Sequence, residues 1–440
     1  MEKLLNETKI LNTLKNTIEQ NNTINSKFYQ KFEVKRGLRN KDGSGVLAGL
    51  THVSSVLGFH KIEGELEPID GILKFRGIPI NELINTFPKN TNDHFERCCF
   101  LLLVGKLATE DELNAFKTYM YQHRNLPQEI IKNVIVGLPS KNIMNKLQTC
   151  ISALYSVDSD PDSIDPYENF LKSIQILAKI PCIITYSYLY AFKNITEFVT
   201  PNSKMTQAEA FFYMLNQGKE ASQVDANIFD KCLVLHTEHG GGNNSTFTTY
   251  CVTSSGSDIY STLAAAIASL KGPLHGSANK KVMDMISNIK ENVSNWTNKD
   301  EVTNYISKLI KKEVYDKSGK IYGLGHAVYT KSDPRAVIIK DQANQLASEK
   351  NREQELALYN IIANETPKIF QSIKDSEKVI SPNVDFFSGF VYDCLNIPSE
   401  IYTPIFAMAR TCGWCAHRIE EILSGKRIIR PGYKYIDPNK

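Results

Sequence analysis

Residues 95–123 read FERCCFLLLVGKLATEDELNAFKTYMYQH, and this stretch decides the fold class. Its apolar side chains recur every three or four positions on either side of Gly105, a spacing typical of helices. No fixed repeat and no alternation of strands with helices interrupts this pattern, so we predict a mainly α-helical protein with helices stacked in layers. The same spacing continues at 127–138, 142–157, 167–192, 206–217, 261–272, 298–312, 333–350 and 351–370.

The N-terminal part of the chain has a different texture. The first 30 residues carry apolar side chains on a roughly helical period and predict an amphipathic helix. Residues 58–80 alternate short apolar runs with Gly and Pro, which predicts a few short strands. The expected fold class is therefore all-α with a few short N-terminal strands. The helix prediction rests on Leu4, Leu5, Ile10, Leu11, Leu14 and Ile18.

Composition excludes several classes of protein. The 440 residues are 42% hydrophobic and 22% charged, with a formal net charge of +3, whereas nucleic-acid and membrane surfaces are rich in clustered basic residues. No uninterrupted apolar run approaches the roughly 18 residues of a membrane span. Glu2, Glu7 and Glu19 make the N-terminus unlike a secretory or transit peptide, and the nine cysteines lie in apolar segments. We expect a cytoplasmic protein that binds neither nucleic acid nor membrane.

Four stretches combine ionisable side chains with glycines or prolines, and they mark the candidate site. They read LHTEHGGGNNSTFTTY at 235–250, KGPLHGSANKK at 271–281, KIYGLGHAVYTKSDPR at 320–335 and SPNVDFFSGFVY at 381–392. Packing alone does not call for a histidine among small residues. We therefore interpret the four stretches as parts of one functional site.

The physical roles of these residues follow from their neighbours. If His275 opens a helix, the positive end of the helix dipole disfavours imidazolium and leaves a neutral hydrogen-bond donor. Asp385 lies among aromatic and branched side chains, which raises the basicity of its carboxylate. Asp333 followed by Pro334 predicts a helix N-terminus with Arg335 in its first turn, a setting that suits a bound carboxylate.

Each feature also has a plainer interpretation. His236 and His239 fit helix-end histidines satisfied by backbone carbonyls, and Asp385 fits an ordinary carboxylate at a helix start. The spacing of the two histidines also suits a metal site, although the zinc motif H-E-x-x-H is absent. Cys412 and Cys415 form a C-x-x-C pair that fits either a redox site or buried helix packing. A metal-binding protein and a thiol oxidoreductase therefore remain alternatives.

Five motifs together resemble the citrate synthase family in their order and spacing. They are LHTEHGGGN, KGPLHGSANKK, GLGHAVYTKSDPR, PNVDFFSG and MARTCGW. The resemblance extends back to GILKFRGIPINEL and covers the chain from about residue 34. It implies an almost wholly helical homodimer. The large domain would comprise 1–276 and 391–440, and the small domain 277–390.

The resemblance also implies a reaction and a catalytic trio. Asp385 would take a proton from the methyl group of acetyl-CoA, and His275 would hydrogen-bond the enolate or enol oxygen. His326 would polarise and protonate the oxaloacetate carbonyl, and citryl-CoA would then hydrolyse to citrate and CoA. No metal and no cofactor besides the co-substrate acetyl-CoA is implied. A 2-methylcitrate synthase using propionyl-CoA is the alternative, since one methylene is discriminated by only about 1–3 kcal/mol in an apolar pocket.

Binding residues carry over from the same motifs. The oxaloacetate site would comprise His239, Asn243, Arg335, Phe406, Arg410 and Arg430 of the partner subunit. The CoA site would comprise Leu274, Lys320, Ile321, Tyr322, Gly323, Leu324, Gly325 and Lys331. Ala327 and Thr330 stand where some family members have a basic residue, which is why Lys331 is the candidate for a CoA phosphate contact.

Overall fold

The computed structural model describes residues 12, 14–62, 65–276, 278–374 and 379–436. The chain forms two compact units. One unit comprises Met1–Gly49 with Arg430–Lys440, and the other comprises Leu50–Ile429. All the predicted site residues except Arg430 belong to the second unit.

The first unit contains short helices with no buried side chains. They are α2 (Lys15–Asn22), α3 (Ser26–Lys31) and the 3₁₀-helix η1 (Arg36–Leu38). We predict one amphipathic helix here, but the described residues form two short ones because the Asn25 side chain accepts the Lys27 N–H and starts a new helix. Leu14 and Ile18 are exposed, and Leu4, Leu5, Ile10 and Leu11 lie outside the described residues.

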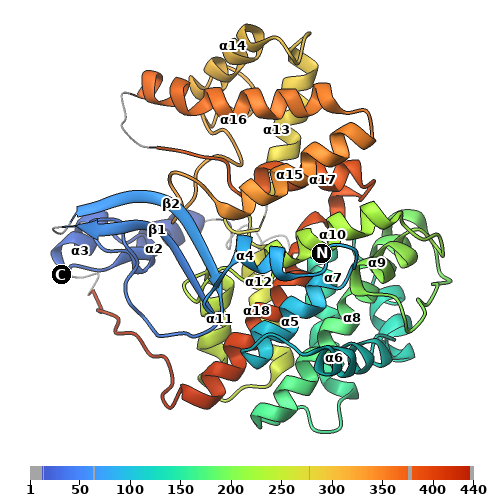
Figure 1. The fold of residues 1–440 in the computed structure, drawn as a ribbon. Helices are drawn as coiled ribbons and strands as arrows, with labels where there is room; N and C mark the ends of the chain where they lie inside the picture. Colours follow the sequence, from blue (N-terminus) through green and yellow to red (C-terminus); the bar gives the residue numbers. More distant parts are fainter. Residues whose placement is uncertain (1–11, 13, 63–64, 277, 375–378, 437–440) are drawn as a thin grey trace, which may run out of the picture. The chain divides into compact units, whose positions relative to one another are not determined.

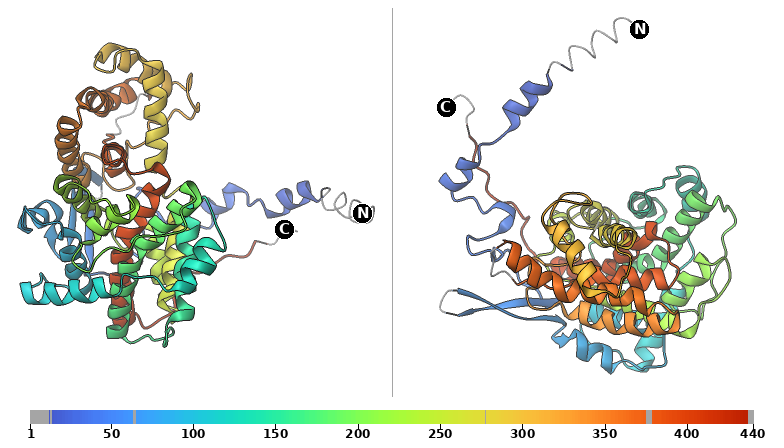
Figure 2. Two further views of the ribbon diagram at one scale, coloured as in Figure 1. Left: turned by 90° about the vertical axis from the view of Figure 1, so that its right-hand side faces the viewer. Right: turned by 90° about the horizontal axis from the view of Figure 1, so that it is seen from above.

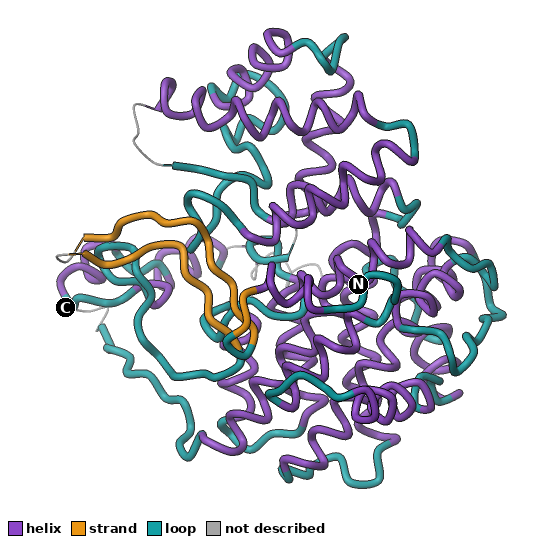
Figure 3. Tube along the Cα trace, viewed as in Figure 1, coloured by secondary structure: helices purple, strands orange, loops and turns teal. Residues whose placement is uncertain are grey.

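An antiparallel hairpin opens the second unit. Strands β1 (Ser54–Ile62) and β2 (Glu65–Phe75) pair along most of their length, and the short β3 (Ile78–Pro79) adds to β2. A bulge between Leu57 and Phe59 interrupts the register of β1. Figure 3 shows that the strands of the described residues are confined to this hairpin region. The prediction of a few strands is confirmed, although β1 and β2 reach 9 and 11 residues.

Helices make up the rest of the second unit, as the sequence predicts (Figure 1). Between the hairpin and residue 272 these are α4 (Ile80–Thr86), α5 (His94–Val104), α6 (Glu110–Gln122), the π-helix η2 (Ile130–Val136), α7 (Ile143–Leu154), η3 (Tyr155–Val157), α8 (Pro166–Lys193), α9 (Gln207–Leu215), α10 (Gln223–His236), α11 (Asn244–Thr253) and α12 (Ile259–Lys271). After them come α13 (Ala278–Asn292), α14 (Lys299–Ile310), α15 (Pro334–Glu349), α16 (Glu353–Lys374), α17 (Val384–Cys394), η4 (Ser399–Ile401) and α18 (Tyr402–Ser424).

Helix α18 lies at the centre of this unit. It packs against α5, α8, α10, α11 and α12, and Figures 1 and 2 show it running among them. Its side chains are buried on all faces from Ala407 to Arg418. A helix enclosed in this way reads as continuously apolar, with polar side chains only where they have a defined role. Arg410, His417 and Arg418 are therefore informative exceptions.

Helices α13 to α17 pack mainly on one another. Helix α16 packs on α14 and α15, and α17 packs on α13 and α15, in the upper part of Figure 1. Helix α15 also contacts α4 and β2, and α13 contacts α18. The predicted small domain, 277–390, covers most of this group, and its boundaries stay a prediction.

Helix α8 is the one described helix that is long and apolar enough to cross a membrane by length and composition. Within its most apolar window, 78% of the residues are buried inside the protein. Its contacts with α6, α7, α9 and α18 account for that burial. Its apolar character is thus explained by packing in the interior.

Candidate active site

The loop after α10 carries the first pair of histidines. His236 ends the helix, and its Nε2 lies 2.9 Å from the Tyr392 hydroxyl, while its buried Nδ1 has no partner among the described residues. His239 is buried, and its Nε2 has no hydrogen-bond partner in the part of the chain that is described. Burial, helped by the positive charge of Arg335, lowers the pKa of His239 well below its usual value. His239 is thus a neutral ring with an unused nitrogen.

Arg410 on α18 supplies further unused donors. Its side chain is fully buried, and only Nε is bonded, to the His236 carbonyl oxygen at 2.8 Å. Its two terminal nitrogens, Nη1 and Nη2, have no partner among the described residues. The guanidinium lies 4.6 Å from the centre of the Phe406 ring. Burial lowers the pKa of Arg410 to about 10, so the group is charged at neutral pH. Two buried donors on a cation form a site for a carboxylate.

The 320–335 loop positions His326. Its Nδ1 accepts hydrogen bonds from the backbone N–H groups of Val328 and Tyr329, at 3.0 and 3.1 Å. In the neutral ring the proton is therefore on Nε2. The His326 ring centre lies 5.0 Å from that of His239 and 4.8 Å from that of Tyr329. The structure thus brings together two histidines that are distant in the sequence.

The end of the same loop forms the predicted helix start. Asp333 caps α15, Pro334 is its first residue, and Arg335 follows in the first turn, as the sequence predicts. Arg335 is buried, and its Nε and Nη2 donate to Asp333 at 3.0 and 2.7 Å. Although burial opposes the charge, Asp333 raises the pKa of Arg335 above its usual value. Arg335 is therefore a fixed positive charge.

Asp385 lies in the first turn of α17. Asn383 caps that helix, and it also donates from its side chain to the Gly325 carbonyl oxygen at 2.9 Å. The helix start is therefore joined to the loop that carries His326. Burial raises the pKa of Asp385 to about 6, although the charges of Arg335 and Arg410 act in the opposite direction. The prediction of a more basic carboxylate is confirmed.

His275 lies in a turn and does not open a helix. Residues 272–276 form the turn after α12, and α13 begins at Ala278, so the condition that His275 opens a helix is not met. The His275 N–H instead bonds the Gly272 carbonyl at 2.9 Å. Burial, together with the charge of Arg410, lowers the pKa of His275 to about 4. The ring is neutral as predicted, but burial replaces the helix dipole as the cause.

Ser245 links His275 to its surroundings. The Ser245 hydroxyl lies 3.2 Å from His275 Nε2, 2.8 Å from the Asn243 side-chain oxygen, and accepts from the Trp414 indole N–H at 3.2 Å. Its single proton serves either Asn243 or His275. When it goes to His275 Nε2, the ring proton is on Nδ1 and is available for a further acceptor.

Taken together, these side chains offer a defined chemistry. The charge of Arg410 acts on His239, His275 and Asp385, which places these groups around one region. The region holds unused cationic donors, neutral imidazoles and a carboxylate of raised basicity. It can bind an anion, accept a proton from a weak acid and donate a hydrogen bond to a developing negative charge.

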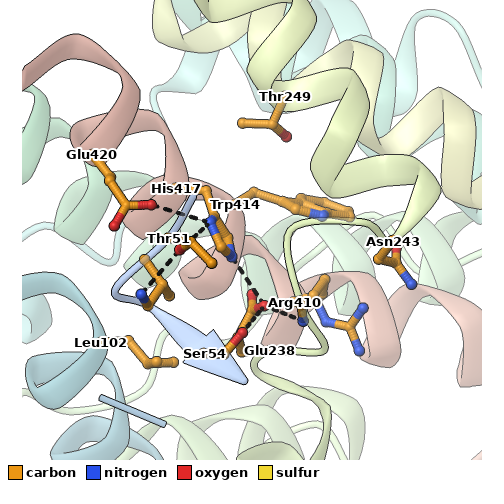
Figure 4. Close-up of polar contacts among 12 residues, drawn as sticks. Thr51, Ser54, Leu102, Glu238, Asn243, Thr249, Arg410, Trp414, His417 and Glu420 are labelled. Carbon is orange, nitrogen blue, oxygen red and sulfur yellow. Dashed lines mark hydrogen bonds and ion pairs between the residues drawn. The ribbon is translucent and has the colours of Figure 1, made fainter. Parts of the chain in front are cut away.

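Sequence reasoning missed the buried ion pair behind this region. Glu238 Oε1 and His417 Nε2 are 3.0 Å apart, and both side chains are fully enclosed. Figure 4 shows Glu238 between His417 and Arg410, with Ser54 bonded to the same carboxylate at 2.8 Å. The only sequence signal is an acidic residue directly before His239. The residue that pairs with it is 179 positions away, which no local pattern reveals.

The predicted CoA residues differ in exposure, and of the set only Ile321 and Gly323 are buried. Residues 320–325 lie in the loop between α14 and α15, where Gly323 and Gly325 have φ values of 81° and 89°. A Cβ on Gly323 would lie 2.8 Å from the Phe386 ring, so only glycine fits there. Leu274 is fully exposed, and Lys331 is exposed. Their roles toward CoA stay predictions.

Arg430 is the one predicted site residue in the first unit. It belongs to the first unit, at the start of the segment Arg430–Lys440, and it is exposed. The contribution of Arg430 of the partner subunit to the oxaloacetate site therefore stays a prediction.

The two alternative chemistries find little support. Cys412 and Cys415 are buried in α18, and burial raises the pKa of Cys415 to about 12, which disfavours a reactive thiolate. The described residues contain no group of three or more His, Cys, Asp or Glu side chains that could hold a metal ion. Packed-helix cysteines account for the C-x-x-C pair.

Comparison with known proteins identifies the family. The family model described as "Citrate synthase, C-terminal domain" matches residues 42–432. This chain belongs to the citrate synthase family. It is thus an enzyme of the acyltransferase type, and the match includes every predicted site residue.

Individual citrate synthase relatives agree. "Citrate synthase 2" of Bacillus subtilis is 36% identical, covering 90% of this chain and 95% of that protein. "Citrate/2-methylcitrate synthase" of the same organism is 33% identical, covering 90% and 95%. The solved ternary complex of Thermoplasma acidophilum citrate synthase with carboxymethyl coenzyme A and oxaloacetate has a TM-score of 0.76 at 26% identity, covering 92% of this chain and 97% of that one. The all-α fold predicted from the sequence is confirmed.

Proposed function

We propose that this protein is a citrate synthase that condenses oxaloacetate with acetyl-CoA and water to give citrate and CoA. The observation that carries the proposal is the pair of unused donors on Arg410, together with the unpartnered Nε2 of His239 and a carboxylate of raised pKa, Asp385. This combination suits a substrate that is an anion next to a weak carbon acid. The solved ternary complex with oxaloacetate and a coenzyme A analogue belongs to a protein of the same fold.

Asp385 begins the reaction as the base. Its carboxylate takes a proton from the methyl group of the thioester, and the electron pair of the broken C–H bond becomes an enolate. A pKa of about 6 leaves Asp385 ionised at neutral pH and more basic than an exposed carboxylate. Neutral His275 donates a hydrogen bond to the enolate oxygen, from Nδ1 when Ser245 donates to Nε2.

His326 acts on the second substrate. The enolate carbon attacks the carbonyl carbon of oxaloacetate, and the proton on His326 Nε2 passes to the carbonyl oxygen as it becomes a hydroxyl. The proton that Asp385 took from the methyl group balances this loss, so His326 and Asp385 both return to their starting forms by the end of the cycle. The two backbone N–H groups at Nδ1 hold the ring in this tautomer. The product of this step is citryl-CoA, and water then cleaves its thioester bond to release citrate and CoA.

The carboxylates of oxaloacetate are matched by fixed cations. Arg410 offers two unpaired terminal nitrogens, and Arg335 supplies a second positive charge. Burial and the charges of both arginines lower the pKa of His239. Phe406 lies under Arg410, and the side-chain oxygen of Asn243 is 2.8 Å from the Ser245 hydroxyl. We propose that a homodimer completes the site with Arg430 of the partner subunit.

Further parts of the proposal concern CoA, cofactors and location. The predicted CoA site comprises Leu274, residues 320–325 and Lys331, where the glycines permit close approach of a ligand to the backbone. The reaction as written needs no metal and no cofactor besides acetyl-CoA. A cytoplasmic location stays a prediction from composition.

A thiol-release assay tests the function. Purified protein is mixed with oxaloacetate and acetyl-CoA, and free CoA is measured with a thiol reagent. We expect release that requires oxaloacetate. The same assay with propionyl-CoA tests the alternative, 2-methylcitrate synthesis, which the relative named for both activities favours. A higher kcat/KM with propionyl-CoA would replace the proposed substrate, and no release with either thioester would overturn the proposal.

Arg410→Lys should raise the KM for oxaloacetate about 10- to 100-fold, because lysine keeps the charge but cannot offer two parallel donors to a carboxylate. Arg418→Lys is the matched control, since Arg418 is a buried arginine of the same helix. Its Nε and Nη1 donate to Asn169, Thr253 and Thr262, and only its Nη2 lacks a partner among the described residues. Steady-state kinetics measure both variants. We expect Arg418→Lys to lower the melting temperature while KM stays the same. An unchanged KM in Arg410→Lys would remove Arg410 from the oxaloacetate site.

A further inference from the structure

Strand β1 contacts the loops of both site histidines. The Ser54 hydroxyl donates to Glu238, the residue before His239, at 2.8 Å. Two positions on, Val56 packs so closely on Gly240 that a Cβ there would lie 2.9 Å from Val56 Cγ2. Residues two apart on a strand share a face, so one face of β1 supports the His239 loop.

Two positions further along β1, Gly58 supports the His326 loop. A Cβ on Gly58 would lie 2.2 Å from the carbonyl oxygen of Val328, whose N–H bonds His326 Nδ1. Gly58 lies in the bulge of β1, and a glycine in a strand marks close approach of another backbone. The strand therefore touches this loop two residues after the histidine itself.

Strand β2 holds the far end of the same loop. The Gly71 N–H donates to the Ser332 carbonyl oxygen at 3.1 Å, and the Ser332 hydroxyl donates to Asp70 at 2.9 Å. A Cβ on Gly71 would lie 2.2 Å from that carbonyl oxygen and 2.6 Å from the Tyr329 ring. The stretch from Val328 to Ser332 is thus held at both ends by the hairpin.

We propose that the β1–β2 hairpin is a template that sets the distance between His239 and His326, with Gly58 and Gly71 as its positioning residues. The inference rests on the proposed function. One hairpin contacts both loops, so the spacing of the two rings follows from the register of its strands. A glycine at each contact lets the loop backbone approach to a distance that any side chain would prevent.

Gly58→Ala tests the template. The added methyl group must displace the Val328 carbonyl, and with it the N–H groups that hold His326. Because a displacement of about 1 Å can cost on the order of 10²-fold in rate, we expect kcat/KM for oxaloacetate to fall about 10- to 100-fold, with a raised KM. A purely structural role would lower the folded fraction and the apparent kcat but leave KM unchanged. That result would overturn the proposal.

Controls come from the same hairpin. Leu57→Ala changes the neighbouring side chain, which is 42% exposed, and should leave KM within twofold of the unchanged protein. Should Gly58→Ala fail to fold, Asp70→Ala removes the bond to Ser332 at an exposed position. We expect it to lower kcat/KM about threefold and to raise the oxaloacetate KM. An unchanged KM in this variant would also contradict the template.

A crystal structure of Gly58→Ala gives a readout that does not depend on activity. We expect the Val328 carbonyl to move and the two hydrogen bonds to His326 Nδ1 to lengthen or break. If the unchanged protein releases no CoA, the proposed function fails, yet this structure still tests the positioning of His326. An undisplaced Val328 and an intact pair of hydrogen bonds would overturn the template.

Discussion

Asp385→Asn is expected to lower kcat by about 10²- to 10⁴-fold while oxaloacetate still binds. The amide has nearly the shape of the carboxylate but cannot accept the methyl proton of the thioester. The two unused donors of Arg410 and the unpartnered Nε2 of His239 are unchanged in the variant, so the anion site remains. Steady-state thiol release gives kcat, and titration calorimetry gives the dissociation constant for oxaloacetate.

Asp393→Asn is the matched control for this prediction. Asp393 lies on the same helix, α17, where its half-exposed side chain pairs with Arg352. We expect kcat to stay within twofold of the unchanged protein. Near-normal turnover in Asp385→Asn would exclude Asp385 as the base, whatever the control shows.

Because the pKa of Asp385 is raised, activity and stability should change with pH in opposite directions. Activity needs the carboxylate, so kcat should fall as the pH drops through about 6. Stability behaves differently, because the folded protein binds this proton more tightly than the unfolded chain, whose carboxyl has a pKa near 3.8. Ionised Asp385 therefore lowers the free energy of unfolding. This destabilisation is absent below pH 4 and complete above pH 6, and it reaches at most about 3 kcal/mol. At pH 8, Asp385→Asn should thus unfold at a higher urea concentration.

Local sequence signals predicted the parts of the site that depend on neighbouring residues. The Asp333–Pro334 pair predicted the start of α15, since capping and proline geometry act within one helical turn. The apolar neighbours of Asp385 predicted its raised pKa. Helical spacing likewise predicted the fold class, because burial of one helix face is written into the sequence every three or four residues.

Contacts between distant residues escaped the same reasoning. The hairpin strands were expected, but nothing in the sequence around Gly58 points to Val328, because the contact is made by backbone atoms. At His275, the sequence indicated a neutral ring but the wrong cause, since the burial comes from the fold and not from the adjacent helix. Gly413 belongs to a recognised motif, yet its role is a contact with Glu238, where a Cβ would lie 2.2 Å from Oε2.

The buried pair of Glu238 and His417 makes the second large prediction. Both nitrogens of His417 face oxygen atoms, with Glu238 at Nε2 and the Tyr250 hydroxyl at Nδ1. Since Tyr250 donates its own proton to Glu420, the ring donates at both nitrogens and is an imidazolium. Burial opposes both charges, but the pairing outweighs it: the pKa of His417 rises to about 9 and that of Glu238 falls to about 2.

Glu238→Gln should therefore destabilise the protein by about 3–5 kcal/mol at pH 7, the usual cost of leaving one member of a buried pair without its counter-ion. Urea unfolding measures this loss. Asp284→Asn is the control, since it also changes a carboxylate to an amide but in the exposed pair with Lys280, where we expect less than about 1 kcal/mol. Equal effects of the two substitutions would contradict the assignment of a buried ion pair.

The pH dependence separates the ion pair from simple packing. The charged His417 ring contributes to the free energy of unfolding. This contribution is complete below its unfolded pKa of 6.5 and is lost as the pH rises through about 9. The contribution of Glu238 is complete above 4.5 and is lost as the pH falls through about 2. The unchanged protein should thus lose about 3 kcal/mol of stability between pH 6.5 and 9.5, and Glu238→Gln should lose much less. If Glu238 serves only as packing, both proteins lose stability in parallel.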